Sequence, residues 1–91
     1  MEKLNTDQIT QALRSVPEWK LRGQEIFRTF QFKDFMGAIR FVNSAALLAE
    51  EANHHPDIDI RWNKVTLTLS THDANGLTAK DFDLAKKFDR L

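Results

Sequence analysis

The hydrophobic positions follow two different periods along the chain, and the change between them separates predicted helices from predicted strands. Between residues 33 and 53 they recur at helical spacing in two rows. From residue 57 to residue 70 apolar and polar residues alternate, which is typical of strands with one buried face. The two helical rows are Phe35, Ile39, Val42, Ala46 and Ala49, and Ala38, Phe41, Ala45, Leu48 and Ala52.

Local signals place the remaining elements. Asn5 with Gln8, and Thr78 with Asp81, match the capping-box pattern and predict helices near both ends of the chain. Residues 19–31 are rich in β-forming residues around a central glycine, which predicts a hairpin. The resulting order is α-β-β-α-β-β-α. This order predicts an α+β fold in which a four-stranded antiparallel sheet carries its helices packed on one face.

The helix over residues 33–53 is apolar over an unusually wide arc. One hydrophobic row is enough to cover a small sheet, so the second row predicts packing against another subunit. We therefore expect a homodimer or homotetramer built on this helix. The alternative is a single wide face that is packed entirely on the protein's own core.

Composition limits the classes of function. The 91 residues fit one domain spanning 1–91. Lys plus Arg and Asp plus Glu both number 13, and this zero net charge argues against a nucleic acid or an anionic membrane as partner. There is no cysteine, which excludes disulfides and thiolate chemistry. No signal peptide or membrane-spanning stretch is recognisable, so the expectation is a soluble cytoplasmic protein.

Candidate chemistry centres on the sequence Asn-His-His-Pro at residues 53–56, which ends the predicted helix. Consecutive helical residues point about 100° apart, so His54 and His55 are not expected to share one packing role. The remaining histidine, His72, follows the second predicted hairpin in the segment Ser-Thr-His-Asp at residues 70–73. These histidines are the natural candidates for proton transfer near neutral pH.

The second hairpin decides whether His72 reaches the histidine pair. If Asn63 and Lys64 form a two-residue loop, antiparallel pairing places His72 opposite His55. A loop shifted by one residue places His72 opposite Asn53 instead. Either register predicts that the three imidazoles converge on one patch.

Carboxylates beside the histidines would fix their tautomers. Glu50 lies four residues before His54, and Glu51 lies four residues before His55. Pro56 pushes His55 out of the helical region, which weakens the second pair and favours a Glu50–His54 pair. Imidazoles of different basicity held close together are the arrangement that acid–base catalysis uses.

Other interpretations of these residues carry less weight. Three histidines could bind zinc, but the familiar spacing His-Glu-x-x-His is absent, and no metal is expected. Asp81 is interpreted first as a helix-capping residue and second as a catalytic one. Trp19 and Trp62 are interpreted as packing residues before ligand platforms.

The stretch from residue 50 to residue 81 resembles the signature of the pterin-4a-carbinolamine dehydratases. The shared elements are an acidic residue, a His-His-Pro sequence, an aromatic residue near a hairpin turn, a later histidine and a downstream aspartate. The similarity extends upstream through residues 17–19 and 26–35 and so covers nearly the whole chain. The matching residues are Glu50, His54, His55, Pro56, Trp62, His72 and Asp81.

The resemblance implies a lyase that dehydrates 4a-hydroxytetrahydropterin to quinonoid dihydropterin, in recycling of a tetrahydrobiopterin-type cofactor. It implies catalytic roles for His54, His55 and His72 with support from Glu50, and possible support from Asp81 and Trp62. The pterin is the substrate, so no cofactor is implied. The implied pterin contacts, largely through backbone groups, are Asn53, His54, His55, Ser70, Thr71, His72 and Asp73.

The reaction suits these residues on chemical grounds. Expelling the hydroxyl needs a proton delivered to its oxygen, and forming the C4a=N5 double bond needs a proton removed from the ring. The hypothesis is that His54, held by Glu50, and His72 exchange these protons, while His55 orients the pterin or shares the acid role. The alternative function is a dimerisation or coactivator module, because some members of the family serve a homeodomain transcription factor in that way.

Overall fold

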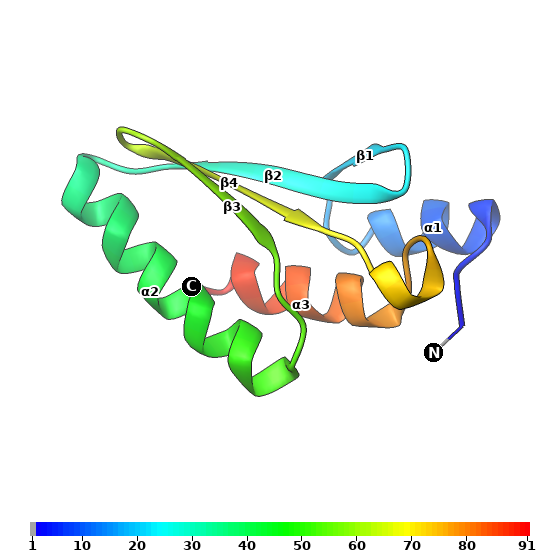
Figure 1. Ribbon diagram of the computed structural model, residues 1–91. Helices are drawn as coiled ribbons and strands as arrows, with labels where there is room; N and C mark the ends of the chain where they lie inside the picture. The colour runs from blue at the N-terminus through cyan, green and yellow to red at the C-terminus, as the bar shows by residue number, and fades with distance from the viewer. Residues whose placement is uncertain (1) are drawn as a thin grey trace.

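Three α-helices, four strands and one short 3-10 helix make up residues 2–91, which the computed structural model describes (Figure 1). The predicted α-β-β-α-β-β-α order is confirmed, and the 3-10 helix η1 is an addition that the sequence pattern did not predict. In chain order the elements are α1 (Thr6–Leu13), β1 (Lys20–Arg22), β2 (Glu25–Gln31), α2 (Phe35–Ala52), β3 (Asp57–Arg61), β4 (Lys64–Leu69), η1 (His72–Ala74) and α3 (Ala79–Asp89).

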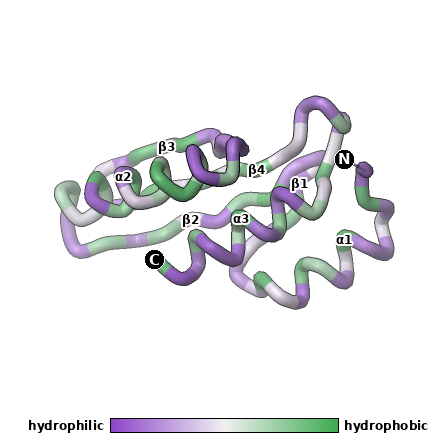
Figure 2. Tube along the Cα trace, turned by 90° about the horizontal axis from the view of Figure 1, so that it is seen from below, coloured by the Kyte–Doolittle hydropathy of each residue, from purple (hydrophilic) through white to green (hydrophobic). Residues whose placement is uncertain are grey.

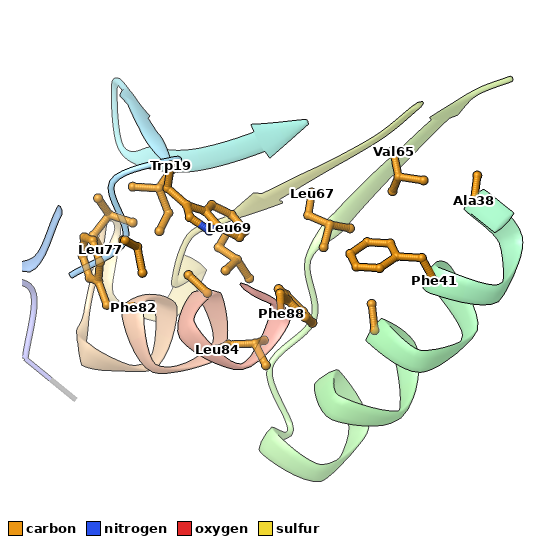
Figure 3. Close-up of a cluster of buried hydrophobic side chains, with 14 residues drawn as sticks. Trp19, Ala38, Phe41, Val65, Leu67, Leu69, Leu77, Phe82, Leu84 and Phe88 are labelled. Atoms are coloured by element: carbon orange, nitrogen blue, oxygen red, sulfur yellow. The ribbon is translucent and has the colours of Figure 1, made fainter. Parts of the chain in front are cut away.

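The strands form one antiparallel sheet in the order β1-β2-β4-β3, and the helices lie on one side of it (Figure 1). The predicted α+β architecture is therefore confirmed. Strand β4 is central and alternates as expected: Val65, Leu67 and Leu69 are fully buried and face the helices (Figure 3). The intervening threonines, Thr66 and Thr68, are half-buried on the other face.

The core between the sheet and the helices is largely aliphatic and aromatic (Figure 3). Phe41 enters it from α2, and Phe88 enters it from α3. Trp19 stacks on Phe88 with 6.4 Å between ring centroids, and its indole N–H donates to the Asp89 carboxylate (Nε1–Oδ1 2.8 Å). The interpretation of Trp19 as a packing residue is therefore confirmed.

The turn between β3 and β4 differs from the one favoured by the sequence. Arg61 pairs with Lys64, so the turn residues are Trp62 and Asn63 rather than Asn63 and Lys64. Asn63 is held by Phe32, because its side-chain amide donates to the Phe32 carbonyl (2.8 Å) and its own carbonyl accepts from the Phe32 N–H (2.8 Å). Trp62 is left with a left-handed φ of 51° and is 70% exposed, so it does not pack in the core of this chain, contrary to the interpretation from the sequence.

Helix α2 covers the sheet with only one of its two hydrophobic rows. The row that begins at Ala38 is buried or half-buried along its whole length. The row that begins at Phe35 is divided, since Ala49 is buried but Phe35 and Ala46 are exposed. Figure 2, seen from the side away from the sheet, shows hydrophobic residues along the length of this helix. Its large exposed hydrophobic residues are Phe35 (48%), Met36 (58%) and Leu47 (69%).

Candidate active site

The three histidines line one cavity of about 300 Å³, at the end of the sheet where β3 begins and β4 ends. The lining of this cavity includes every residue for which the resemblance implied a substrate contact, and it adds Lys80. The lining residues are Asn53, His54, His55, Ser70, Thr71, His72, Asp73 and Lys80.

The end of α2 determines where the two adjacent histidines point. Asn53 follows the helix in the left-handed region, with φ 49° and ψ 43°, a conformation that asparagine tolerates better than most residues. The N–H groups of Asn53 and His54 bond back to the carbonyls of Glu50 and Ala49, each at 3.1 Å. This helix termination redirects the chain before His54, so the spacing rules of a continuous helix do not apply to that residue.

His54 pairs with Asp81. The sequence had favoured Glu50 as its partner, and that prediction is wrong. Its Nε2 atom lies 2.6 Å from Oδ1 of Asp81, and the two side chains are 11% and 0% exposed. Glu50 instead contacts His55, with 2.5 Å between Oε2 and Nε2. The physical reason is the left-handed Asn53, which rotates His54 off the face of α2 that carries Glu50.

The two histidine–carboxylate pairs therefore occupy very different environments. The His55 and Glu50 side chains are 58% and 74% exposed, so their attraction is screened by water and contributes little. The His54–Asp81 pair is almost completely withdrawn from solvent, where a charge-assisted hydrogen bond is stronger and more orienting. The geometry distinguishes one imidazole held by a buried carboxylate from one imidazole paired with an exposed carboxylate.

Asp81 makes the capping contact that the sequence favoured and also contacts His54, while a catalytic role for it stays a prediction. Its Oδ2 atom accepts from the Thr78 N–H (2.9 Å), which completes the predicted capping box at the start of α3. The same oxygen accepts from the Thr71 hydroxyl (2.8 Å), while Oδ1 meets His54. One carboxylate thus caps a helix and holds an imidazole.

His72 reaches the cavity through a tight loop rather than through a continued strand. Strand β4 ends at Leu69, and Thr71 pairs with Gly76 through two backbone hydrogen bonds of 2.8 and 3.3 Å. His72 opens η1 inside this loop and is exposed.

No group of three histidine, cysteine, aspartate or glutamate side chains within residues 2–91 is arranged to hold a metal ion. None of the helices formed by these residues combines the length and the apolar character that crossing a bilayer requires.

A family model described as pterin 4 alpha carbinolamine dehydratase matches residues 2–91. The chain belongs to this family. A protein of Roseiflexus castenholzii is 57% identical over 88 residues, which cover 97% of this chain and 95% of that protein. A protein of Nocardia farcinica is 53% identical over 90 residues, covering 99% and 95% of the two chains. Both relatives carry the name pterin-4-alpha-carbinolamine dehydratase on a provisional basis.

A solved structure supports the same assignment. A Brucella melitensis protein, described as a transcriptional coactivator/pterin dehydratase, superposes with a TM-score of 0.94 at 37% sequence identity. The match covers 98% of this chain and 97% of the Brucella protein. The pterin-4a-carbinolamine dehydratase fold therefore extends over essentially the whole chain.

Trp62 is the one residue of the family-like signature that the structure places away from the cavity. It sits in the turn between β3 and β4, at the opposite end of these strands from the histidine cavity. Figure 1 shows the course of the two strands. The five residues of β3 separate it from the cavity, a span of roughly 16 Å. Within one chain, Trp62 therefore does not support the chemistry by direct contact, contrary to the role that the resemblance had implied as possible.

Lys80 is the cavity residue that the sequence interpretation missed. It is exposed and lies in the first turn of α3, one residue before Asp81. The capping box had already fixed the start of this helix, but no local pattern shows which cavity a helix end faces. That relationship depends on how α3 packs against α2 and the loop of His72.

Proposed function

We propose that this chain dehydrates 4a-hydroxytetrahydropterin to quinonoid dihydropterin by histidine acid–base catalysis. The observation that carries the proposal is the cavity shared by His54, His55 and His72. Its volume of about 300 Å³ suits a bicyclic pterin, because small-molecule sites begin at roughly this size. Family membership of the chain supports the same substrate class.

The proposed reaction needs two proton transfers and no change in oxidation state. A base removes the proton on N5 of the ring, and the N5 electrons form the C4a=N5 double bond. An acid protonates the hydroxyl at C4a, and the C–O bond breaks to release water. Exchange with solvent then restores both side chains. Imidazole is suited to both steps near neutral pH.

His54 and His72 are proposed to exchange these protons. His54 is oriented by the buried Asp81, which replaces Glu50 in the role that the sequence had given it. His55, with its exposed partner Glu50, would orient the pterin or share the acid role. The same function would serve recycling of a tetrahydrobiopterin-type cofactor.

An optical assay with the purified chain tests the proposal directly. We expect 4a-hydroxytetrahydropterin to dehydrate roughly 10² times faster than the spontaneous reaction or more, because positioned acids and bases contribute at least that much. The rate of quinonoid dihydropterin formation should rise in proportion to protein concentration. Prior treatment with a chelator should leave it unchanged, since the proposed proton transfers use no metal. A rate equal to the spontaneous one would reject the dehydratase function.

Self-association through α2 is the second part of the proposal, and the exposed hydrophobic side of that helix supports it. A surface with Phe35, Met36 and Leu47 exposed on one helix is costly to leave in water. A homodimer or homotetramer would cover it. The same surface favours a dimerisation or coactivator module as the alternative function, and the Brucella melitensis protein of the same fold is described as a coactivator.

Replacing Leu47 by glutamate tests the role of this surface. Leu47 is 69% exposed, so the fold should tolerate the change while a buried interface should not. We expect the variant to sediment as a smaller species than the unmodified chain at micromolar concentration, with an unchanged circular dichroism spectrum. Gln11→Glu, at an exposed position of α1 away from this face, is the control and should keep the original assembly. Identical sedimentation of all three proteins would contradict an interface on this face.

A further inference from the structure

Two threonine hydroxyls connect the carboxylate of Asp81 to the loop that carries His72. The hydroxyl of Thr71 lies 2.8 Å from Oδ2 of Asp81 and 2.9 Å from the hydroxyl of Thr78. Thr78 and Asp81 are both 0% exposed. The backbone of Thr71 also closes the His72 loop through its pairing with Gly76. Thr71 therefore contacts the carboxylate that holds His54 and also closes the loop that carries His72.

The direction of each hydrogen bond in this network follows from counting protons. A carboxylate only accepts, and a hydroxyl carries a single proton. The Thr71 hydroxyl therefore donates to Asp81, so the Thr78 hydroxyl must donate to Thr71. With the Thr78 N–H as the second donor, Oδ2 of Asp81 receives two hydrogen bonds. The remaining oxygen, Oδ1, is the acceptor that faces His54.

An acceptor at this position selects one tautomer of His54. The Nε2 atom must carry a proton to donate to Oδ1 across 2.6 Å, so in the neutral ring Nδ1 holds the lone pair. Among residues 2–91, Oδ1 of Asn63 is the buried side-chain atom that lacks a hydrogen-bond partner. Nδ1 of His54 is therefore not an atom that is both buried and without a partner. His54 lines the cavity, and Nδ1 is its ring nitrogen left free for a ligand.

We propose that Thr71 and Thr78 are positioning residues that fix the Nε2–H tautomer of His54 and make Nδ1 the atom that removes the N5 proton. The inference rests on the proposed dehydration and deepens it by assigning the base. After transfer, the imidazolium keeps its Nε2–H on Asp81, and solvent later accepts the proton from Nδ1. The Thr71 side chain acts through Asp81, while the backbone contact of Thr71 with the pterin that the resemblance implies stays a prediction.

Thr71→Val tests the proposal, because valine keeps the shape of threonine and removes the hydroxyl. Nitrogen-15 NMR of ring-labelled histidine, at a pH where the His54 ring is neutral, reads the tautomer directly. We expect Nε2–H alone in the unmodified chain. In the variant Asp81 loses one of the two hydrogen bonds that hold its carboxylate in place, so part of the population should lose the Asp81–His54 contact and, with it, the preference for this tautomer. The value of kcat should fall roughly 10-fold, as for loss of one hydrogen bond to a charged group, with KM unchanged. Thr71→Ser should restore both readings.

The matched control is Thr66→Val, which removes another hydroxyl pair between threonines, the 2.8 Å contact of Thr66 with Thr29 on the exposed side of the sheet. It should change neither the His54 tautomer nor kcat. Three results would overturn the inference: an Nδ1–H tautomer in the unmodified chain, an unaltered tautomer in Thr71→Val, or a rise in KM alone. The NMR reading requires no turnover, so it stays decisive even if the dehydratase function is rejected. The first of these three results is read from the unmodified chain and does not depend on the folding of any variant.

Discussion

Replacing Asp81 by asparagine is expected to lower kcat for the dehydration by roughly 10²- to 10⁴-fold, the range seen when a catalytic histidine is held in the wrong tautomer. The amide has the size of the carboxylate, but only its oxygen accepts. The Thr71 hydroxyl and the Thr78 N–H both donate at this position, so that oxygen must face them. The amide N–H₂ then faces His54 and forces the ring proton from Nε2 to Nδ1.

The measurement compares kcat and the folded state of the variant with those of a matched control. Asp83→Asn makes the same chemical change at an exposed position of α3, two residues along, and should retain the original kcat. Asp81→Asn should keep its circular dichroism spectrum, because the amide oxygen still caps the helix. A folded Asp81→Asn variant with full kcat would show that Asp81 does not hold a working base.

Removing both proposed proton carriers, in a His54→Ala/His72→Ala variant, is expected to return the reaction to its spontaneous rate. The loss corresponds to the roughly 10²- to 10⁴-fold that general acid–base catalysis supplies. The two single variants should not add, because residues that act as one unit lose most of their effect when either is removed. The physical reason is that the cavity would bind the pterin while both residues proposed to exchange its protons were absent.

The optical assay measures this loss, and Trp62→Ala is its control. Trp62 belongs to the family-like signature but is 70% exposed in the β3–β4 turn, away from the cavity, so its replacement should leave kcat unchanged. Full activity in the double histidine variant would refute the assignment of His54 and His72. Activity that falls with Trp62→Ala and not with the histidine variant would place the chemistry elsewhere.

The parts of the fold that could be predicted are those that short segments determine. The capping boxes at Asn5 and Thr78 both form, because each needs only residues within one helical turn. The alternation of β4 placed Val65, Leu67 and Leu69 on one buried face without knowledge of the partner strands. The meeting of the histidines followed from a hairpin that returns the chain to its starting point, whichever of two registers it used.

The parts that could not be predicted depend on contacts between distant segments. The register of the β3–β4 turn was settled by Phe32, which lies 31 positions before Asn63 and binds it through side chain and backbone. Helical spacing from Glu50 to His54 assumed that α2 continued, whereas Asn53 ends it in the left-handed region. Lys80 entered the cavity only because α3 packs where it does.

The α-helices, the strands, their order and the convergence of three imidazoles followed from the sequence alone, because periodicity and capping act within a few residues. Which carboxylate pairs with which histidine depended instead on contacts between distant segments. Asp81 lies 27 positions after His54, and no local rule links residues at that separation. Burial of both side chains against α3 made this contact the orienting one, while the nearer Glu50 remained in water with His55.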